Sequence, residues 1–399
     1  MQFRLRNFLI FGAIGLGLIP VFVVGLFTYM NATKTPLHPS LENVPFVTAP
    51  GLVAGWEDAV THARQAAIAG LVEQNLPGMS VAVGVNGEVV WAEGFGWADL
   101  EDRVKYTPDT RFRIGTASTA IASAAAGLLI EQNRLKLNED IRTYVPEFPV
   151  KEWPVTVRQL MSGTAGIRGD GGDEEDLRTH CERPIEALQK FSDSDLRYEP
   201  GTEFRYSSYG WILMSAAIEA AAGESFHTFI RRHIFEPLDM KDTRLDSPSA
   251  SLSKQANFYF PRFKADPTYG PQEPMEADFS CFFGAAGFVS TSTDLARFGL
   301  AVNHGKLLQP ATVQMLQAPQ QTASGKETGY GLGWDLETAT LAGQPIVVVG
   351  HDGVLMGGNV ASLMIFRERG LVVAVISNTA FADTYAIGLK VAEAFATKK

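Results

Sequence analysis

The first pattern in the chain is a long apolar stretch near its start. Residues 8–30 are almost wholly apolar, and residues 7–33 contain no charged side chain. A stretch of this length is sufficient for a helix to cross a bilayer. Arg4 and Arg6 precede it, so the positive-inside rule places the following domain in the periplasm or outside the cell. We expect residues 1–33 to form an anchor in the cytoplasmic membrane, with a cleaved signal peptide or an organelle-targeting segment as alternatives.

The pattern changes twice after this stretch. Residues 34–54 contain several prolines and have no clear period, which is typical of a linker. Residues 55–76 have the spacing of an amphipathic helix. Two alternating segments follow, Met79–Val85 and Glu88–Phe95, and the Asn-Gly pair between them predicts a hairpin.

The rest of the chain predicts the fold class. Residues 116–133 form an Ala-rich helix with little polar surface, which we expect to be buried. Near the C-terminus, three strand-like runs cover residues 346–350, 360–366 and 371–377. A final helix follows over residues 383–396. We expect an α+β domain over residues 55–397, with an antiparallel sheet of five or more strands flanked by helices. A mainly helical subdomain covers about 116–285.

Composition excludes several classes of protein. The 399 residues include 34 Lys and Arg against 44 Asp and Glu, a net charge of −10, which disfavours nucleic acid as a partner. There is no HExxH, P-loop or dinucleotide-binding motif, so we expect neither a metal nor an organic cofactor. Export would permit a disulfide between Cys181 and Cys281, but two free buried thiols remain an alternative. The acidic segment 170–176 is expected to be a solvated loop.

Four segments contain residues suited to nucleophilic catalysis, and their order along the chain is informative. The first opens the Ala-rich helix, the second leads into another Ala-rich helix, and the fourth lies at a strand edge. The segments are Phe112–Thr119, Tyr198–Gly210, Gly284–Phe298 and Gly350–Val354. They resemble the serine β-lactamase-related family, which includes class C β-lactamases, penicillin-binding proteins and esterases. The resemblance covers residues 56–397.

Two further stretches extend this resemblance, Tyr144–Pro149 and Val155–Ile167. Tyr144–Pro149, together with Tyr206-Ser-Ser208, is particularly similar to the branch that contains the mitochondrial serine β-lactamase-like protein. The resemblance implies a β-lactamase or DD-peptidase type of fold with a cleft between the sheet and the helical subdomain.

The chain differs from the family at the positions of the family's catalytic residues. In the family, a serine at the start of a helix attacks a carbonyl, and a lysine one turn later on the same face assists it. These two positions are Thr116 and Thr119 here. Tyr206 matches the family's proton-relaying tyrosine. Without a positive neighbour, nothing in the sequence would lower its pKa from the ordinary value for a phenol, about 10. Thr116 also suits a helix N-cap.

The substrate-binding motif is altered as well. Ser208 stands where many members have Asn, and His351 is a residue that the family accepts. Asp352 replaces a hydroxyl residue, and its carboxylate should repel an anionic substrate. Gly353 and Val354 complete the motif, and the resemblance implies that the backbone N–H of Val354 contributes to an oxyanion hole. His351 is either a substrate-binding group or a structural histidine. Since neighbouring strand residues point to opposite faces, we expect no dyad between it and Asp352.

Three functions are compatible with the sequence. The first is a membrane-anchored family member that has lost its catalytic pair and retains the cleft for a small acyl or peptide-like ligand. The second is an active acyl hydrolase, acting on esters, peptides or β-lactams, with Thr116 as nucleophile and Tyr206 as base. The third is a structural protein that self-assembles at the membrane. The sequence favours the first and identifies no protein partner.

Overall fold

A computed structural model describes residues 22–51, 54–169, 179–246, 254–263, 265–272 and 276–396. The predicted anchor therefore lies mostly outside the described residues, as do the acidic segment 170–176 and the last residues of the chain. A helix covers residues 22–32 in the part that is described. No helix in that part is both long and apolar enough to span a bilayer.

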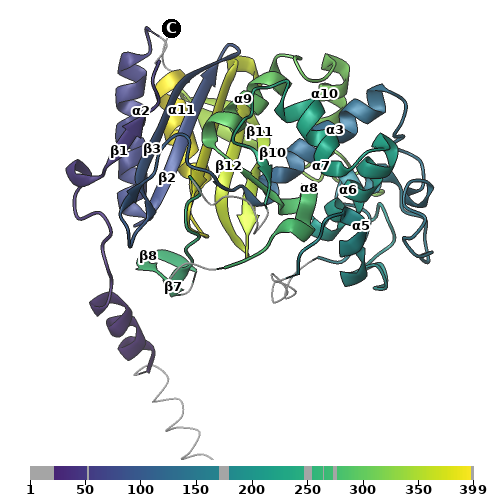
Figure 1. The fold of residues 1–399 in the computed structure, drawn as a ribbon, viewed down its shortest axis with the longest axis horizontal. Coiled ribbons are helices and arrows are strands. Elements are labelled where there is room, and N and C mark those ends of the chain that lie inside the picture. Colours follow the sequence, from purple (N-terminus) through teal and green to yellow (C-terminus); the bar gives the residue numbers. More distant parts are fainter. Residues whose placement is uncertain are drawn as a thin grey trace, which may run out of the picture.

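One antiparallel sheet forms the centre of the molecule (Figure 1). Its strand order is β1-β3-β2-β13-β12-β11-β10, and β4 pairs with β3. The sheet therefore joins strands from both ends of the sequence, as the pattern of the chain predicted. The strands are β1 (Phe46–Thr48), β2 (Gly78–Val85), β3 (Glu88–Asp99), β4 (Val104–Lys105), β10 (Asp335–Leu341), β11 (Gln344–Leu355), β12 (Gly358–Phe366) and β13 (Leu371–Ser377).

Helices cover both faces of the sheet (Figure 1). On one face, α2 (Glu57–Glu73) and α11 (Thr384–Ala396) bury apolar side chains against strand residues such as Val83 and Val373. On the other face, α9 (Ser292–Asn303) lies against β2, β12 and β13. Strand residues alternate between these two cores, and this alternation is the period-2 pattern that predicted the hairpin.

The helical region adjoins the second face. Its central helix α3 is buried over most of its length, as the Ala-rich sequence predicted, because small side chains let neighbouring helices approach closely. A disulfide between Cys181 and Cys281 links two segments of this region. The helices are α3 (Ser118–Glu131), α4 (Val157–Met161), α5 (Pro184–Ala187), α6 (Ser208–Ala222), α7 (Phe226–Ile230), α8 (Phe283–Ala286) and α10 (Pro310–Leu316).

Two smaller sheets complete the described elements. The first has the order β5-β9-β6, and the second is the hairpin β7-β8 near the helix at residues 22–32 (Figure 1). Their strands are β5 (Phe112–Arg113), β6 (Arg244–Leu245), β7 (Pro261–Phe263), β8 (Asp266–Pro271) and β9 (Phe288–Ser290).

The segment after the N-terminal helix lies against the domain. Arg262 on β7 donates to the carbonyl and hydroxyl oxygens of Thr33. Asn75 accepts from the N–H of Leu37 and donates to the carbonyl of Thr35. The buried ring of His38 is hydrogen-bonded to the carbonyl of Leu76 at 3.0 Å. Thr33, at the end of the predicted anchor, and residues 34–38, which the sequence predicts as part of a linker, are therefore held by side chains of the domain.

A close backbone contact joins the helical region to the sheet. The short helix η2 (Gly115–Ala117) precedes α3 and lies against β11. Gly115 has φ +53°, and a Cβ atom there would lie 2.5 Å from the carbonyl oxygen of Val354. A Cβ atom at Gly353 would lie 2.1 Å from the carbonyl oxygen of Ile114. Only glycine permits this approach at both positions.

This contact predicts the effect of adding one methyl group. Gly353→Ala should lower the free energy of unfolding by about 2–3 kcal/mol, because the two backbones must separate to admit the Cβ atom. Gly169→Ala is the control, since its Cβ atom would meet no atom within 4 Å. Chemical denaturation measures both. Equal stability of the two variants would contradict the close contact.

Candidate active-site cleft

A cavity of about 520 Å³ lies where η2, α6 and β11 meet, and it brings together most of the residues that the sequence singled out. Six of them line it: Thr116, Tyr206, Ser208, His351, Asp352 and Val354. Thr119 lies behind this wall and is fully buried. Gly353 instead permits the contact between η2 and β11. The structure thus places the predicted residues together, and their chemical roles remain predictions.

The position of Thr116 follows from where the neighbouring strand begins. β10 begins at Asp335, which pairs with Gly350, so β11 continues past the end of its partner. In place of a strand, the hydroxyl of Thr116 meets this edge. Its Oγ1 donates to the carbonyl of Asp352 at 2.9 Å and accepts from the N–H of Val354 at 2.9 Å.

This geometry corrects one sequence prediction. Thr116 is not a helix N-cap: Ile114 and Ala117 occupy the cap positions of η2 and α3, and neither makes a side-chain cap hydrogen bond. The hydroxyl of Thr116 bonds to a strand more than 200 residues away in the sequence. The reason is that the edge of β11 offers both a donor and an acceptor at the distance that one hydroxyl can satisfy.

The position of the family's lysine is filled by a second hydroxyl. Thr119 Oγ1 lies 2.9 Å from the hydroxyl oxygen of Tyr206. Thr119 Oγ1 also lies 3.5 Å from the carbonyl of Ala285, so both of these partners of Thr119 are neutral. An alcohol is far too weak a base to take a proton from another alcohol near neutral pH. Thr119 therefore keeps the tyrosine in place and supplies no positive charge.

His351 lies in the wall with both ring nitrogens engaged. Its Nδ1 is 2.7 Å from the carbonyl oxygen of Asp352, and its Nε2 is 3.1 Å from the hydroxyl of Tyr330. Burial raises the pKa of Tyr330 well above its usual value, so the phenol stays protonated. Both ring nitrogens thus have partners other than the carboxylate of Asp352. The carboxylate oxygen Oδ2 of Asp335 lies 3.6 Å from Nδ1.

Asp352 is a half-buried acid with an unusual proton affinity. Its carboxylate accepts from Ser362 Oγ at 2.6 Å across the β11–β12 pair. Burial raises its pKa to about 6, and the nearby Asp335 and Glu337 add to this shift, while Ser362 and His351 oppose it. A group with this pKa is mainly ionised at neutral pH and mainly protonated below pH 5.

The sequence did not single out several residues that shape the cleft. Asp335 begins β10 and Tyr330 lies five residues before it, in a stretch with no clear period. They reach the cleft because β10 pairs with β11. The remaining wall is apolar and largely aromatic: Phe204, Phe279, Phe282, Leu355 and Met356. Phe204 packs on Tyr330 with ring centroids 5.4 Å apart. Phe204 lies within the segment Tyr198–Gly210, and this position was the one indication in the sequence that it lines the cleft.

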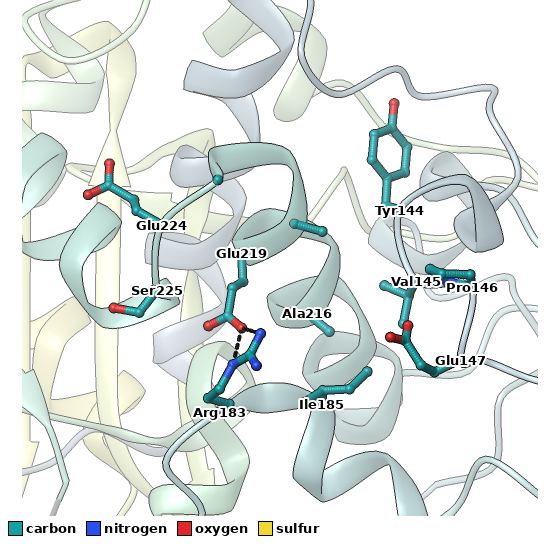
Figure 2. Close-up of a pocket in the computed structure, with 12 residues that line it drawn as sticks. Tyr144, Val145, Pro146, Glu147, Arg183, Ile185, Ala216, Glu219, Glu224 and Ser225 are labelled. Carbon is teal, nitrogen blue, oxygen red and sulfur yellow. Dashed lines mark hydrogen bonds and ion pairs between the residues drawn. The ribbon is translucent and has the colours of Figure 1, made fainter.

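A second cavity, of about 470 Å³, lies outside the cleft (Figure 2). It is lined by α6 and by loops that include Tyr144 and Glu147. Arg183 donates to Glu219 at 2.8 Å, and Glu219 also accepts from the N–H of Phe226. The charged groups at its centre therefore satisfy one another. Across the described residues, no group of three or more His, Cys, Asp or Glu side chains is arranged to hold a metal ion.

The raised pKa of Asp352 predicts a pH-dependent stability. The folded chain binds this proton more tightly than the unfolded chain, whose Asp has a pKa near 3.8, so stability falls as the pH rises from about 4 to 6. Asp352→Asn should remove this penalty and raise the free energy of unfolding by about 2–3 kcal/mol at neutral pH, with no gain below about pH 4. Urea denaturation at both pH values measures it.

The exposed acid Glu88 provides the control, since Glu88→Gln should change stability little at either pH. The asparagine can still accept from Ser362, which keeps the local hydrogen bond. A gain of the same size at acidic and neutral pH would show that packing, and not ionisation, causes the effect.

Comparison with known proteins agrees with the fold. The chain is 26% identical to the mouse (Mus musculus) serine beta-lactamase-like protein LACTB, mitochondrial, over 460 aligned positions that cover 88% of this chain and 83% of the mouse protein. The structure is similar to an octameric penicillin-binding protein homologue from Pyrococcus abyssi, with a TM-score of 0.69 and 21% identity over 83% of this chain and 76% of that one.

It is also similar to D-amino acid amidase from Ochrobactrum anthropi SV3, with a TM-score of 0.69 and 22% identity over 84% of this chain and 98% of that one. At these identities the solved structures show the fold alone. The sequence model of the family described as Beta-lactamase matches residues 61–397. This chain therefore belongs to the beta-lactamase family of serine hydrolase-related proteins.

Proposed function

We propose that this chain is a family member that has lost hydrolytic activity and uses its cleft to bind a small ligand. One observation carries the proposal: the hydroxyl proton of Thr116 is donated to the carbonyl oxygen of Asp352. A nucleophilic alcohol needs a base to accept its proton as it attacks. A backbone carbonyl oxygen is too weakly basic to do this.

The surroundings of Thr116 support the same conclusion. The N–H of Val354, which the family resemblance assigns to the oxyanion hole, donates to Thr116 Oγ1. An attacking Thr116 would have to release this donor before the donor could stabilise an oxyanion. The alternative, an acyl hydrolase with Thr116 as nucleophile, also needs Tyr206 as base, and Tyr206 lies against the neutral hydroxyl of Thr119.

The proposal predicts that the wild-type protein neither turns over p-nitrophenyl acetate nor forms an adduct with a fluorophosphonate. In the variant Thr116→Ser/Thr119→Lys, an amine replaces the hydroxyl 2.9 Å from Tyr206 and supplies the missing base. This variant should form the fluorophosphonate adduct. It should also hydrolyse p-nitrophenyl acetate at least about 100-fold faster than wild type, as expected for general-base assistance.

Intact-mass spectrometry locates the adduct, and Thr116→Ala is the blank. A stable adduct on Thr116 of the wild-type protein, lost in Thr116→Ala, would overturn the proposal. If the double variant gains nothing, Asp352→Thr is added, since that residue also departs from the family. We expect the triple variant to be needed before an anionic β-lactam reacts.

We also propose that residues 1–33 anchor the chain in a membrane and that the domain lies in an oxidising compartment. The apolar stretch 8–30 and the preceding Arg4 and Arg6 support this topology. The described end of this segment has exposed apolar side chains, including Phe22, with 71% of its surface accessible. The disulfide supports an oxidising compartment, because cytosolic thiols are kept reduced.

The anchor is tested in the full chain by placing charge in the apolar stretch. Ile14→Arg/Leu18→Arg should release the protein from carbonate-washed membranes, because each arginine costs about 2.5–3.5 kcal/mol at the centre of a membrane helix. Leu41→Arg is the control, since Leu41 is exposed outside the stretch. Membrane retention of the double variant would contradict the anchor. Mass spectrometry of the mature protein determines whether the segment is cleaved.

A further inference from the structure

The cleft has an unbalanced charge. Asp335 and Asp352 both line it, and none of the described lining residues is Lys or Arg. The side chain of Asp335 is 36% exposed and is the more accessible of the two carboxylates. A carboxylate in a partly closed, low-dielectric cleft interacts more strongly with a charged ligand than it would in water.

His351 is the one basic side chain among the described residues that line the cleft. Its Nδ1 lies 2.7 Å from the carbonyl oxygen of Asp352, and its Nε2 lies 3.1 Å from the hydroxyl of Tyr330. The carboxylate oxygen Oδ2 of Asp335 is 3.6 Å from Nδ1. One imidazole therefore accompanies two carboxylates, so the acids outnumber the basic group in the cleft.

The rest of the cleft suits an apolar body. Tyr206 and Tyr330 pack edge-to-face with ring centroids 6.3 Å apart, and both line the same cavity as Phe204. Phe279 and Phe282 come from a separate segment of the chain and line the cavity as well. A volume of about 520 Å³ admits a small molecule with one aromatic ring or a short aliphatic chain.

From these observations we infer that the cleft selects small organic ammonium ions with an aromatic or aliphatic body, and excludes the carboxylates that family resemblance would suggest. The ammonium group lies against Asp335 and Asp352, and the apolar body lies against the aromatic wall. This inference rests on the proposed binding function and adds the charge and the shape of the ligand. It involves no covalent step.

Three ligands with the same phenylethyl frame test this inference on the full-length protein. They are 2-phenylethylamine, 3-phenylpropanamide and 3-phenylpropanoate, which carry a positive, a neutral and a negative head group at neutral pH. Calorimetric titration measures the dissociation constants. We expect the dissociation constant of the amine to be at least about tenfold lower than that of the carboxylate. The amine can form charge-assisted hydrogen bonds with the acids, whereas the carboxylate is repelled by them.

Variants separate the carboxylates from general effects. Asp335→Asn/Asp352→Asn should reduce the affinity for the amine about tenfold and abolish the preference for it over the carboxylate. Asp335→Asn alone should give most of this loss, which covers the case in which the double variant is unstable. Glu147→Gln, in the second cavity, removes one negative charge elsewhere and should leave the preference unchanged (Figure 2).

Several outcomes would overturn the inference: equal or tighter binding of the carboxylate, no binding of the amine, or a preference that survives in both Asp335 variants. The proposed function fails in a different way. Conversion of 3-phenylpropanamide to the acid and ammonia, lost in Thr116→Ala, would demonstrate hydrolysis whatever the charge preference. The two readouts therefore distinguish a wrong ligand class from a wrong function.

Discussion

The cleft depends on the contact between the backbone of η2 and the free edge of β11. β10 begins opposite Gly350, and the edge beyond that point would otherwise expose unpaired N–H and C=O groups. The hydroxyl of Thr116 satisfies one of each. Gly115 and Gly353 let the two backbones come close enough for this. The residue at the family's nucleophile position thus contributes to holding the helical region on the sheet, which supports the proposed loss of hydrolytic activity.

The electrostatics of the cleft are consistent with this structural role. The family's positions for cations hold Thr119 and His351, and in this structure the first is neutral by nature and the second is engaged by two neutral partners. The acids Asp335 and Asp352 then set the sign of the local potential, and their mutual proximity contributes to the raised pKa of Asp352. The inferred preference for ammonium ions follows from this sign, since two carboxylates should disfavour a ligand that carries a carboxylate of its own. The changes at separate motifs therefore act together on one property, the charge that a ligand must carry.

Sequence reasoning predicted the elements better than the contacts between them. Periodicity identified α2, the β2–β3 hairpin, α3 and the C-terminal strands, because each has a buried face with a regular repeat. The order of motifs indicated the fold and which residues share the cleft. The hydrogen bonds of Thr116 could not be predicted, since its partner is set by where β10 begins and the local sequence favoured a cap. Asp335 and Tyr330 were missed for the same reason, and the Cys181–Cys281 bridge could not be decided from spacing alone.

The hydrogen bonds of residues 33–38 have a mechanical consequence. A freely jointed connection would let the globular part tumble independently of the apolar helix at 22–32. Here Arg262 holds that connection to β7, while Asn75 and the neighbouring carbonyl of Leu76 hold it to the loop after α2. These two attachments restrict how the helix can turn relative to the globular part, so a surface that held the helix would also limit the directions in which the cleft can open.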